Sequence, residues 1–156
     1  AYADHQKGLC TYDVEQVVLA IVVTTGIASI FLTKDCTPDY NSGLAHAVFY
    51  ALTSYPVIEK LHLHGEVVGF GVLLALLVDR QEEEFEKIYK LNREIGLPVS
   101  LKEIEITEDE WEESMNRIPE MSDVAHYPYR VTKEMLRDAM DRLKERAGKD
   151  AYDTEK

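Results

Sequence analysis

Two histidines, His46 and His64, are the side chains in this sequence best suited to binding a metal ion. They lie 18 residues apart, which on one unbroken helix would separate them by about 27 Å along the axis. Pro56 interrupts such a helix, so the chain can fold back and bring the two imidazoles together. His64 would then begin the second helix, where the helix dipole favours the neutral imidazole that a metal requires. The spacing is compatible with a two-histidine metal site; the alternative is one hydrogen-bonded core histidine and one helix-capping histidine.

Three further side chains, His62, Glu66 and His126, have more than one possible role. His62 and His64 form an H-x-H pair, which together with His46 would make a three-histidine zinc site of the hydrolytic kind. Residues two apart share a face only on a strand, and we expect none here, so His62 is predicted to lie on the surface. Glu66 either hydrogen-bonds to a metal ligand or caps the amides of the helix that His64 begins. His126 is expected to form hydrogen bonds within a loop.

Other catalytic patterns are absent from the sequence. It contains no GxSxG nucleophile motif, no HExxH metalloprotease motif and no GxGxxG dinucleotide-binding motif. Gly65, Gly69 and Gly71 fit neither a dinucleotide-binding nor a phosphate-binding loop, and we expect them to allow close helix packing. No catalytic residue beyond the two metal ligands is predicted, and no cofactor-binding residue.

The hydrophobic pattern and the capping signals predict an all-α fold of about seven helices without a convincing strand. Residues 57–63 are predicted to form a short connector, and Gly96 and Pro98 to end the helix that precedes Gly96. Thr107 to Glu110 are predicted to form a capping box, and Gly148 to end the last helix. The expected helices cover 17–32, 43–54, 64–78 and 79–95, then a short turn from 100, a helix from 107 and a last helix from 132.

The apolar run 17–32 raises the question of a membrane span. Its sixteen residues fall short of the roughly 20 that a bilayer requires. A helix buried on every side is therefore predicted. Because two or three consecutive helices are apolar all round, some of them should pack against a partner, either another domain or a second copy of the chain.

Composition excludes several classes of protein. The 156 residues fit one domain, with 29 acidic and 17 basic side chains giving a net charge of −12. That charge argues against binding nucleic acid and against anchoring on an anionic membrane. Cys10 and Cys36 have no metal or disulfide spacing, and the N-terminus does not read as a signal peptide. A cytoplasmic protein with reduced thiols is predicted.

Four segments carry a resemblance to a known family. The segment 42–47 (SGLAHA), followed by 64–71 (HGEVVGFG), resembles the metal-binding half of a glycerol dehydrogenase of the iron-containing alcohol dehydrogenase superfamily. The segments 95–99 (IGLPV) and 124–129 (VAHYPY) resemble the same family in the same order. The resemblance spans roughly residues 13–145 and implies a dehydroquinate synthase-like C-terminal helical domain.

The resemblance implies a function and a set of cofactors. In the family a divalent ion, zinc or iron, is held by two histidines and an aspartate, and the histidines match His46 and His64. It implies zinc rather than iron here, NAD in the complete enzyme, and glycerol or a related polyol or alcohol as substrate. The metal acts as a Lewis acid on the alcohol oxygen, so that hydride can pass to NAD. The aspartate and the N-terminal NAD-binding domain belong to upstream segments that these 156 residues do not contain.

Residues 1–156 are therefore expected to form a single metal- and substrate-binding domain that is inactive alone. It should pack against the missing N-terminal domain or self-associate. The competing hypothesis is a stand-alone helical module that mediates interactions without catalysis.

Overall fold

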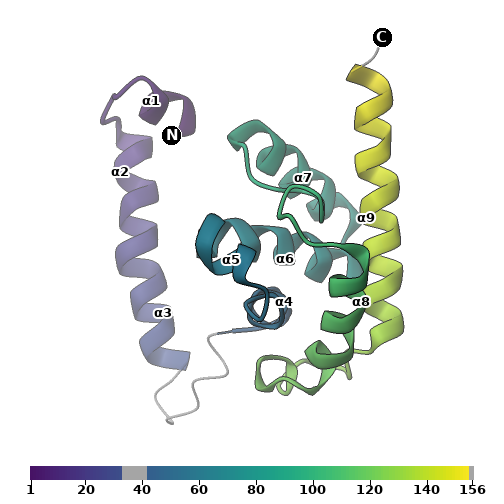
Figure 1. Cartoon of the computed structure of the whole chain (residues 1–156). Helices are drawn as coiled ribbons and strands as arrows, with labels where there is room; N and C mark the ends of the chain where they lie inside the picture. The colour runs from purple at the N-terminus through teal and green to yellow at the C-terminus, as the bar shows by residue number, and fades with distance from the viewer. Residues whose placement is uncertain (33–41, 155–156) are drawn as a thin grey trace. The chain divides into compact units, whose positions relative to one another are not determined.

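The computed structural model describes residues 1–32 and 42–154, and this part of the chain consists of helices and turns without a strand. The predicted all-α class is confirmed. The chain divides into two compact units, Ala1–Asn41 and Ser42–Lys156, whose elements Figure 1 labels. Cys36 lies outside the described residues, whereas Cys10 is exposed as a free thiol.

The N-terminal unit is a short helix followed by a long one. The short helix α1 covers Tyr2–Gln6. The long helix begins with α2 (Tyr12–Leu19), passes through one π-helical turn, η1 (Ala20–Thr24), and ends with α3 (Thr25–Leu32). The side-chain hydroxyl of Thr25 donates to the carbonyl of Ala20 at 3.1 Å, five residues earlier, within this wider turn.

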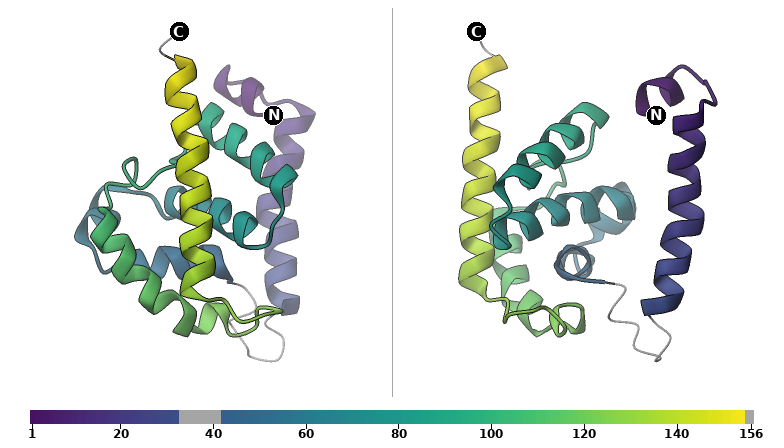
Figure 2. Two further views of the ribbon diagram at one scale, coloured as in Figure 1. Left: turned by 90° about the vertical axis from the view of Figure 1, so that its right-hand side faces the viewer. Right: turned by 180° about the vertical axis from the view of Figure 1, so that it is seen from behind.

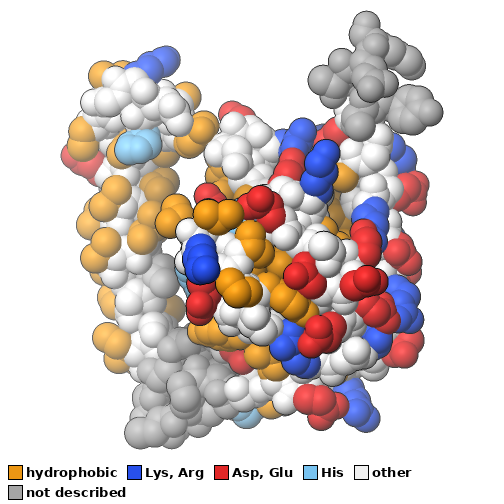
Figure 3. All heavy atoms as spheres, in the orientation of Figure 1, with side chains coloured by type: hydrophobic (Ala, Val, Ile, Leu, Met, Phe, Trp, Pro, Cys, Tyr) orange, Lys and Arg blue, Asp and Glu red, His pale blue; other side chains and the backbone are white. Residues whose placement is uncertain are grey.

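The prediction that the run 17–32 is buried on every side is wrong for this structure. Apolar side chains are exposed all along the helix, among them Ile21, Val22 and Ile30 at 65–70%, and Figure 3 shows hydrophobic side chains following it. Within residues 1–32, the only element that packs on this helix is the five-residue α1, which is too short to cover it.

The prediction that this apolar helix is too short to span a bilayer is also wrong. The helix continues N-terminally to Tyr12, so Tyr12–Phe31 is 20 residues long with a mean hydropathy of 2.0, and none of its 18-residue window is buried. By length and composition alone this helix could cross a membrane. The core helices of soluble proteins pass the same test.

The C-terminal unit is built around α6 (His64–Val78), which packs against α4, α7 and α9. Figure 2 shows these helices from two further sides. In chain order the unit consists of α4 (Leu44–Leu52), α5 (Pro56–Leu61), α6, α7 (Glu82–Ile95), α8 (Glu108–Arg117), the 3-10 turns η3 (Ile118–Glu120) and η4 (Ser122–Val124), and α9 (Lys133–Thr154).

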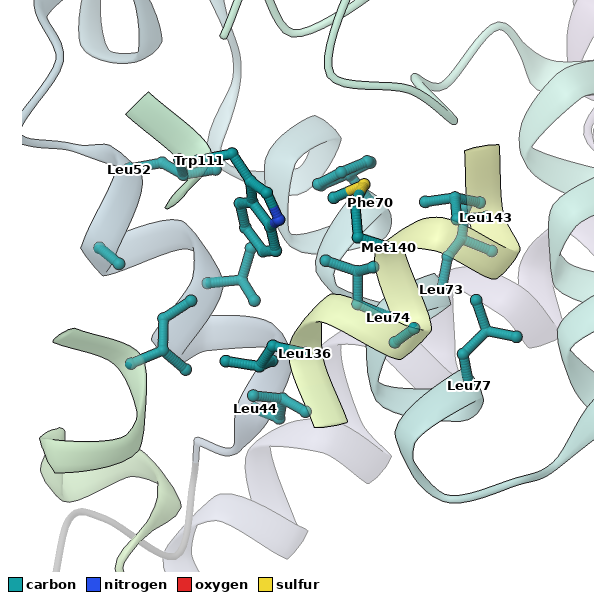
Figure 4. Close-up of a cluster of buried hydrophobic side chains, with 14 of the residues drawn as sticks. Leu44, Leu52, Phe70, Leu73, Leu74, Leu77, Trp111, Leu136, Met140 and Leu143 are labelled. Atoms are coloured by element: carbon teal, nitrogen blue, oxygen red, sulfur yellow. The ribbon is translucent and has the colours of Figure 1, made fainter. Parts of the chain in front are cut away.

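The core of this unit explains why α6 is apolar on nearly every face. Buried side chains of α6 point in several directions, including Val67, Phe70 and Leu74. Trp111 of α8 lies among them at 2% exposure, and Figure 4 shows it within the same cluster as Leu136. Because helices lie on several sides of α6, burial replaces the amphipathic pattern of a surface helix.

Helix boundaries follow the predicted capping signals at two places. The Thr107 hydroxyl accepts from the amide of Glu110, whose carboxylate accepts from the amide of Thr107, so the predicted capping box is confirmed. Gly96 ends α7 in the left-handed conformation, at a φ of 78°. The turn that follows Ser100 is present as well.

Two boundary predictions are wrong. The expected connector contains α5, because Pro56 stands at the first position of a helix, where its missing N–H costs nothing. The last helix does not end at Gly148 but continues to Thr154. Beyond Gly148, the Asp150 carboxylate accepts a hydrogen bond from Tyr89 of α7 and pairs with Arg146, which stabilises the extra turns.

Tyr89 joins α7 to α9 through a buried hydroxyl. The side chain is 1% exposed, its hydroxyl donates to Asp150 at 2.9 Å, and the Arg146 guanidinium lies 4.4 Å from its ring centre. Burial, followed by the hydrogen bond to Asp150 and the charge of Asp150, raises the pKa of Tyr89 to about 12, although Arg146 and Arg93 act against this. Since the unfolded chain loses the proton near pH 10, the folded state binds more protons between these two values.

Alkaline pH should therefore destabilise the fold through Tyr89. The contribution is fully present below pH 10 and is lost as the pH rises toward 12, at a slope of up to about 1.4 kcal/mol per pH unit. Urea unfolding at a series of pH values should show a shallower loss above pH 10 in Tyr89→Phe than in the wild type. An equal slope in the two proteins would contradict the assignment to Tyr89.

Candidate metal centre

The two halves of the candidate site meet where α4 crosses α6. A Cβ atom added to Gly71 would lie 2.6 Å from the carbonyl oxygen of Ala45 and 2.9 Å from its Cα. The backbones can approach this closely only because Gly71 has no side chain. The crossing point is next to His46, so the glycine fixes where His46 stands relative to α6.

His46 and His64 come together at this crossing. His46 lies in the first turn of α4 and His64 is the first residue of α6. Their ring centres are 5.5 Å apart, and the ring planes are inclined at 42°. His46 is half-buried, whereas His64 is exposed to solvent. The predicted fold-back of the chain after Pro56 therefore brings these two imidazoles together.

The environment of His46 favours its neutral form. Burial lowers the pKa of His46 below its ordinary value, and the positive charge that His64 can carry lowers it further. The carboxylate of Asp123, in η4, acts in the opposite direction. An imidazole that resists protonation keeps a lone pair available for a metal ion.

Aromatic side chains lie beside the two histidines. The ring of Phe49 meets that of His64 at 4.4 Å between centres and an angle of 80°, an edge-to-face arrangement. Tyr50 lies 6.4 Å from His46 by the same measure. Tyr127 approaches Gly43, three residues before His46, to within 3.6 Å of a Cβ atom placed there. The site thus has an apolar wall beside a solvent-exposed imidazole.

His62 does not join the pair, and its predicted surface position is wrong. Its side chain is only 11% exposed, with Nδ1 3.4 Å from Glu66 and Nε2 3.6 Å from Glu105. The ring nitrogens of His62 lie near Glu66 and Glu105, whereas the ring of His64 lies beside those of His46 and Phe49. Within the described part of the chain, no three His, Cys, Asp or Glu side chains are grouped so that they could hold a metal. The described residues therefore do not bring His62 into a three-histidine cluster with His46 and His64.

Glu66 has the structural role that was one of its two predicted alternatives. Its carboxylate accepts a hydrogen bond from the amide of Leu63 at 3.0 Å, at the start of α6. This contact satisfies a backbone donor that the helix leaves unpaired and places a negative charge at its N-terminus. His126 lies exposed in the loop after η4.

The arrangement of His46 and His64 fits a metal ion by one geometric measure. Zinc–nitrogen bonds of about 2.0–2.1 Å place the ring centres of two imidazoles on one tetrahedral ion roughly 5–6 Å apart. The observed 5.5 Å lies within that range. Two protein ligands leave the remaining coordination positions to water, substrate or residues from outside this chain.

Comparisons with known proteins show which proteins this chain is similar to. No family model matches the chain. It is 42% identical over 67 residues to a glycerol dehydrogenase from Pseudomonas putida and 32% identical over 109 residues to one from Citrobacter freundii. A crystal structure described as a probable glycerol dehydrogenase from Sinorhizobium meliloti superposes on 88% of this chain with a TM-score of 0.64 and 25% identity. The chain matches part of a glycerol dehydrogenase.

The match covers a minor part of each glycerol dehydrogenase. The aligned segments amount to 42% of this chain and 18% of the P. putida protein, and to 67% of this chain and 26% of the C. freundii protein. The superposed region is 38% of the S. meliloti glycerol dehydrogenase. The predicted resemblance to the helical part of this family is confirmed.

Two residues of the site were not predicted from the sequence. The charge of Asp123 acts on the pKa of His46 from a 3-10 turn 77 positions later, and no spacing rule links the two. Phe49 lies three residues after His46 on a helix, which puts both side chains on one face. That spacing is the signal that could have found it.

Proposed function

We propose that this chain is the metal-binding domain of a glycerol dehydrogenase-like oxidoreductase that acts on glycerol or a related polyol or alcohol. The observation that carries the proposal is the convergence of His46 and His64, 5.5 Å apart, at the α4–α6 crossing, in a chain related to glycerol dehydrogenases. His46 and His64 are the proposed ligands, and zinc is the proposed metal rather than iron.

The metal, when bound, supplies a Lewis acid that polarises the alcohol oxygen and favours hydride loss from the adjoining carbon. The chain's own part is to hold two neutral imidazoles in fixed positions. Burial keeps His46 unprotonated, and the Gly71–Ala45 contact sets its distance from α6. Phe49 and Tyr50 provide an apolar wall beside them.

The remaining parts of the enzyme are proposed to come from residues outside this sequence. They would supply a third ligand and the site for NAD, and the complete enzyme would operate in the cytoplasm. The 156 residues would then form one metal- and substrate-binding domain of a larger whole. The coverage of 18–26% of the curated relatives is consistent with this division.

Zinc titration of the chain by calorimetry tests the proposal. We expect one zinc per chain, with affinity at least about ten-fold weaker in His46→Ala and in His64→Ala, because each removes one of two ligands. His62→Ala is the matched control, and it should keep the wild-type affinity since its ring nitrogens face Glu66 and Glu105. Absence of zinc binding, or equal losses in all three variants, would contradict the assignment.

Activity measurements on the same variants distinguish a catalytic domain from a non-catalytic interaction module. The chain alone should give no NAD-linked glycerol oxidation, and fusion to the N-terminal part of a related glycerol dehydrogenase should restore it. His46→Ala and His64→Ala in the fusion should remain inactive. A fusion that binds zinc but shows no turnover would favour the interaction module.

A further inference from the structure

The side chain of His64 lacks the usual support of a metal-binding histidine. Such histidines commonly donate their second ring N–H to a carboxylate or carbonyl, which fixes the orientation of the ring. Across residues 1–32 and 42–150, no hydrogen bond involves the His64 imidazole, which is exposed to solvent. Glu66, two residues later, is occupied with the Leu63 amide and His62. Something else must hold this ring in place if it is to face His46.

Phe49 makes the closest aromatic contact of His64. The two ring centres are 4.4 Å apart and the planes are nearly perpendicular, at 80°. The arrangement is favourable because the positive edge of one ring meets the negative face of the other, at about 0.5–1.5 kcal/mol per pair. Phe49 is itself half-buried and packed against the core, so it is the fixed partner of the two.

The position of Phe49 links both histidines. It lies three residues after His46 on α4, and the two side chains therefore share one face of that helix. From this face Phe49 reaches across to the first residue of α6. A single rigid element thus carries one ligand and orients the other.

We propose that Phe49 is a positioning residue for the metal site and sets the orientation of the His64 ring in place of a hydrogen bond. The inference rests on the proposed function, since it concerns the same two ligands. It extends that function by naming a residue without metal-binding chemistry on which metal affinity depends.

Cobalt(II) and zinc titrations of three variants test this role. Phe49→Leu keeps an apolar side chain but removes the ring, and it should weaken zinc affinity about ten-fold and change the visible absorption spectrum of bound cobalt(II). Phe49→Tyr keeps the ring and should preserve both. Phe85→Leu, the same substitution in the core between α7 and its neighbours, should lower stability but leave affinity and spectrum unchanged.

A measurement without metal separates this inference from the proposed function. In the NMR spectrum of the metal-free chain, the ring protons of His64 should show a ring-current shift that Phe49→Leu removes and Phe49→Tyr retains. If Phe49→Leu keeps the zinc affinity, the cobalt(II) spectrum and the His64 chemical shifts of the wild type, the positioning role is overturned. The proposed function would then still stand. Failure of the wild-type chain to bind zinc would instead overturn the proposed function, and the positioning role with it.

Discussion

Replacing Gly71 with alanine is expected to lower the free energy of unfolding by about 3 kcal/mol, at the upper end of overpacking effects. The added methyl would lie 2.6 Å from the Ala45 carbonyl oxygen and 2.9 Å from its Cα. Both atoms belong to the backbone of α4, so no rotation of a side chain can relieve the overlap. The helices must move apart at the centre of the unit's most extensive helix pair.

Gly69→Ala is the matched control on the same helix. The nearest neighbour of a Cβ atom added at Gly69 would be a terminal methyl of Leu97 at 3.4 Å, which is the end of a flexible side chain. Removing a glycine from a helix should then stabilise the protein by up to about 1 kcal/mol. Urea unfolding followed by circular dichroism measures both changes. Equal stability of Gly71→Ala and the wild type would show that the α4–α6 crossing is looser than described.

Gly71→Ala should also affect the candidate metal site. Ala45 adjoins His46, so any separation of α4 from α6 increases the distance between His46 and His64. Zinc affinity should fall in Gly71→Ala and remain at the wild-type level in Gly69→Ala. The coupling follows from the position of the glycine rather than from contact with the metal.

The sequence predicted the parts of the fold that depend on local chemistry. The capping box at Thr107, the stop at Gly96 and the break at Pro56 all act within a few residues, and each is present. The return of the chain after Pro56 followed from such a break, and with it the pairing of His46 with His64. These signals can be read from the residues because their partners are neighbours in the sequence.

Other features depend on partners distant in the sequence and were not predicted. Gly65, Gly69 and Gly71 were all expected to serve close packing, but only Gly71 meets a backbone, and nothing lies within 4 Å of a Cβ atom at Gly65. The extension of α9 past Gly148 depends on Asp150 accepting a hydrogen bond from Tyr89, 61 residues earlier. Composition alone distinguishes none of these cases.

Burial of apolar side chains was the least predictable property. The runs 17–32 and 64–78 are similarly apolar, and the first was expected to be buried on every side. The second became the centre of a unit because α4, α7 and α9 pack around it, whereas the first is contacted, within residues 1–32, only by α1. The hydrophobicity of a helix indicates that its burial would be favourable. Whether other elements are present to bury it depends on the rest of the chain and on its partners.

Charged side chains on the C-terminal unit contribute less to its stability than their number suggests. Figure 3 shows acidic and basic groups mixed over the face that includes α8 and α9, where Arg137 and Lys133 both pair with Glu112 at 2.6 Å. Exposed pairs of this kind stabilise a protein by about 0–1 kcal/mol each. The stability of the unit should therefore depend on its buried side chains, of which Trp111 is the largest.

Replacing Trp111 with alanine is expected to cost about 3–5 kcal/mol of unfolding free energy. The indole is 2% exposed and lies among the side chains contributed by α4, α6 and α9, so its removal leaves a cavity that four helices would have to move to fill. Because Trp111 is the only tryptophan, unfolding must be followed by circular dichroism rather than by fluorescence. Leu61→Ala, at 66% exposure in the same unit, should change stability by less than about 0.5 kcal/mol.

The indole nitrogen of Trp111 makes a second substitution informative. Nε1 is buried and has no hydrogen-bond partner among the described residues. A buried donor without an acceptor costs about 1–3 kcal/mol, and phenylalanine does not carry that cost. Trp111→Phe should therefore lose less than about 1.5 kcal/mol, since the removal of the donor offsets part of the lost volume. A loss as large as that of Trp111→Ala would mean that Nε1 has an acceptor in solution, such as an ordered water.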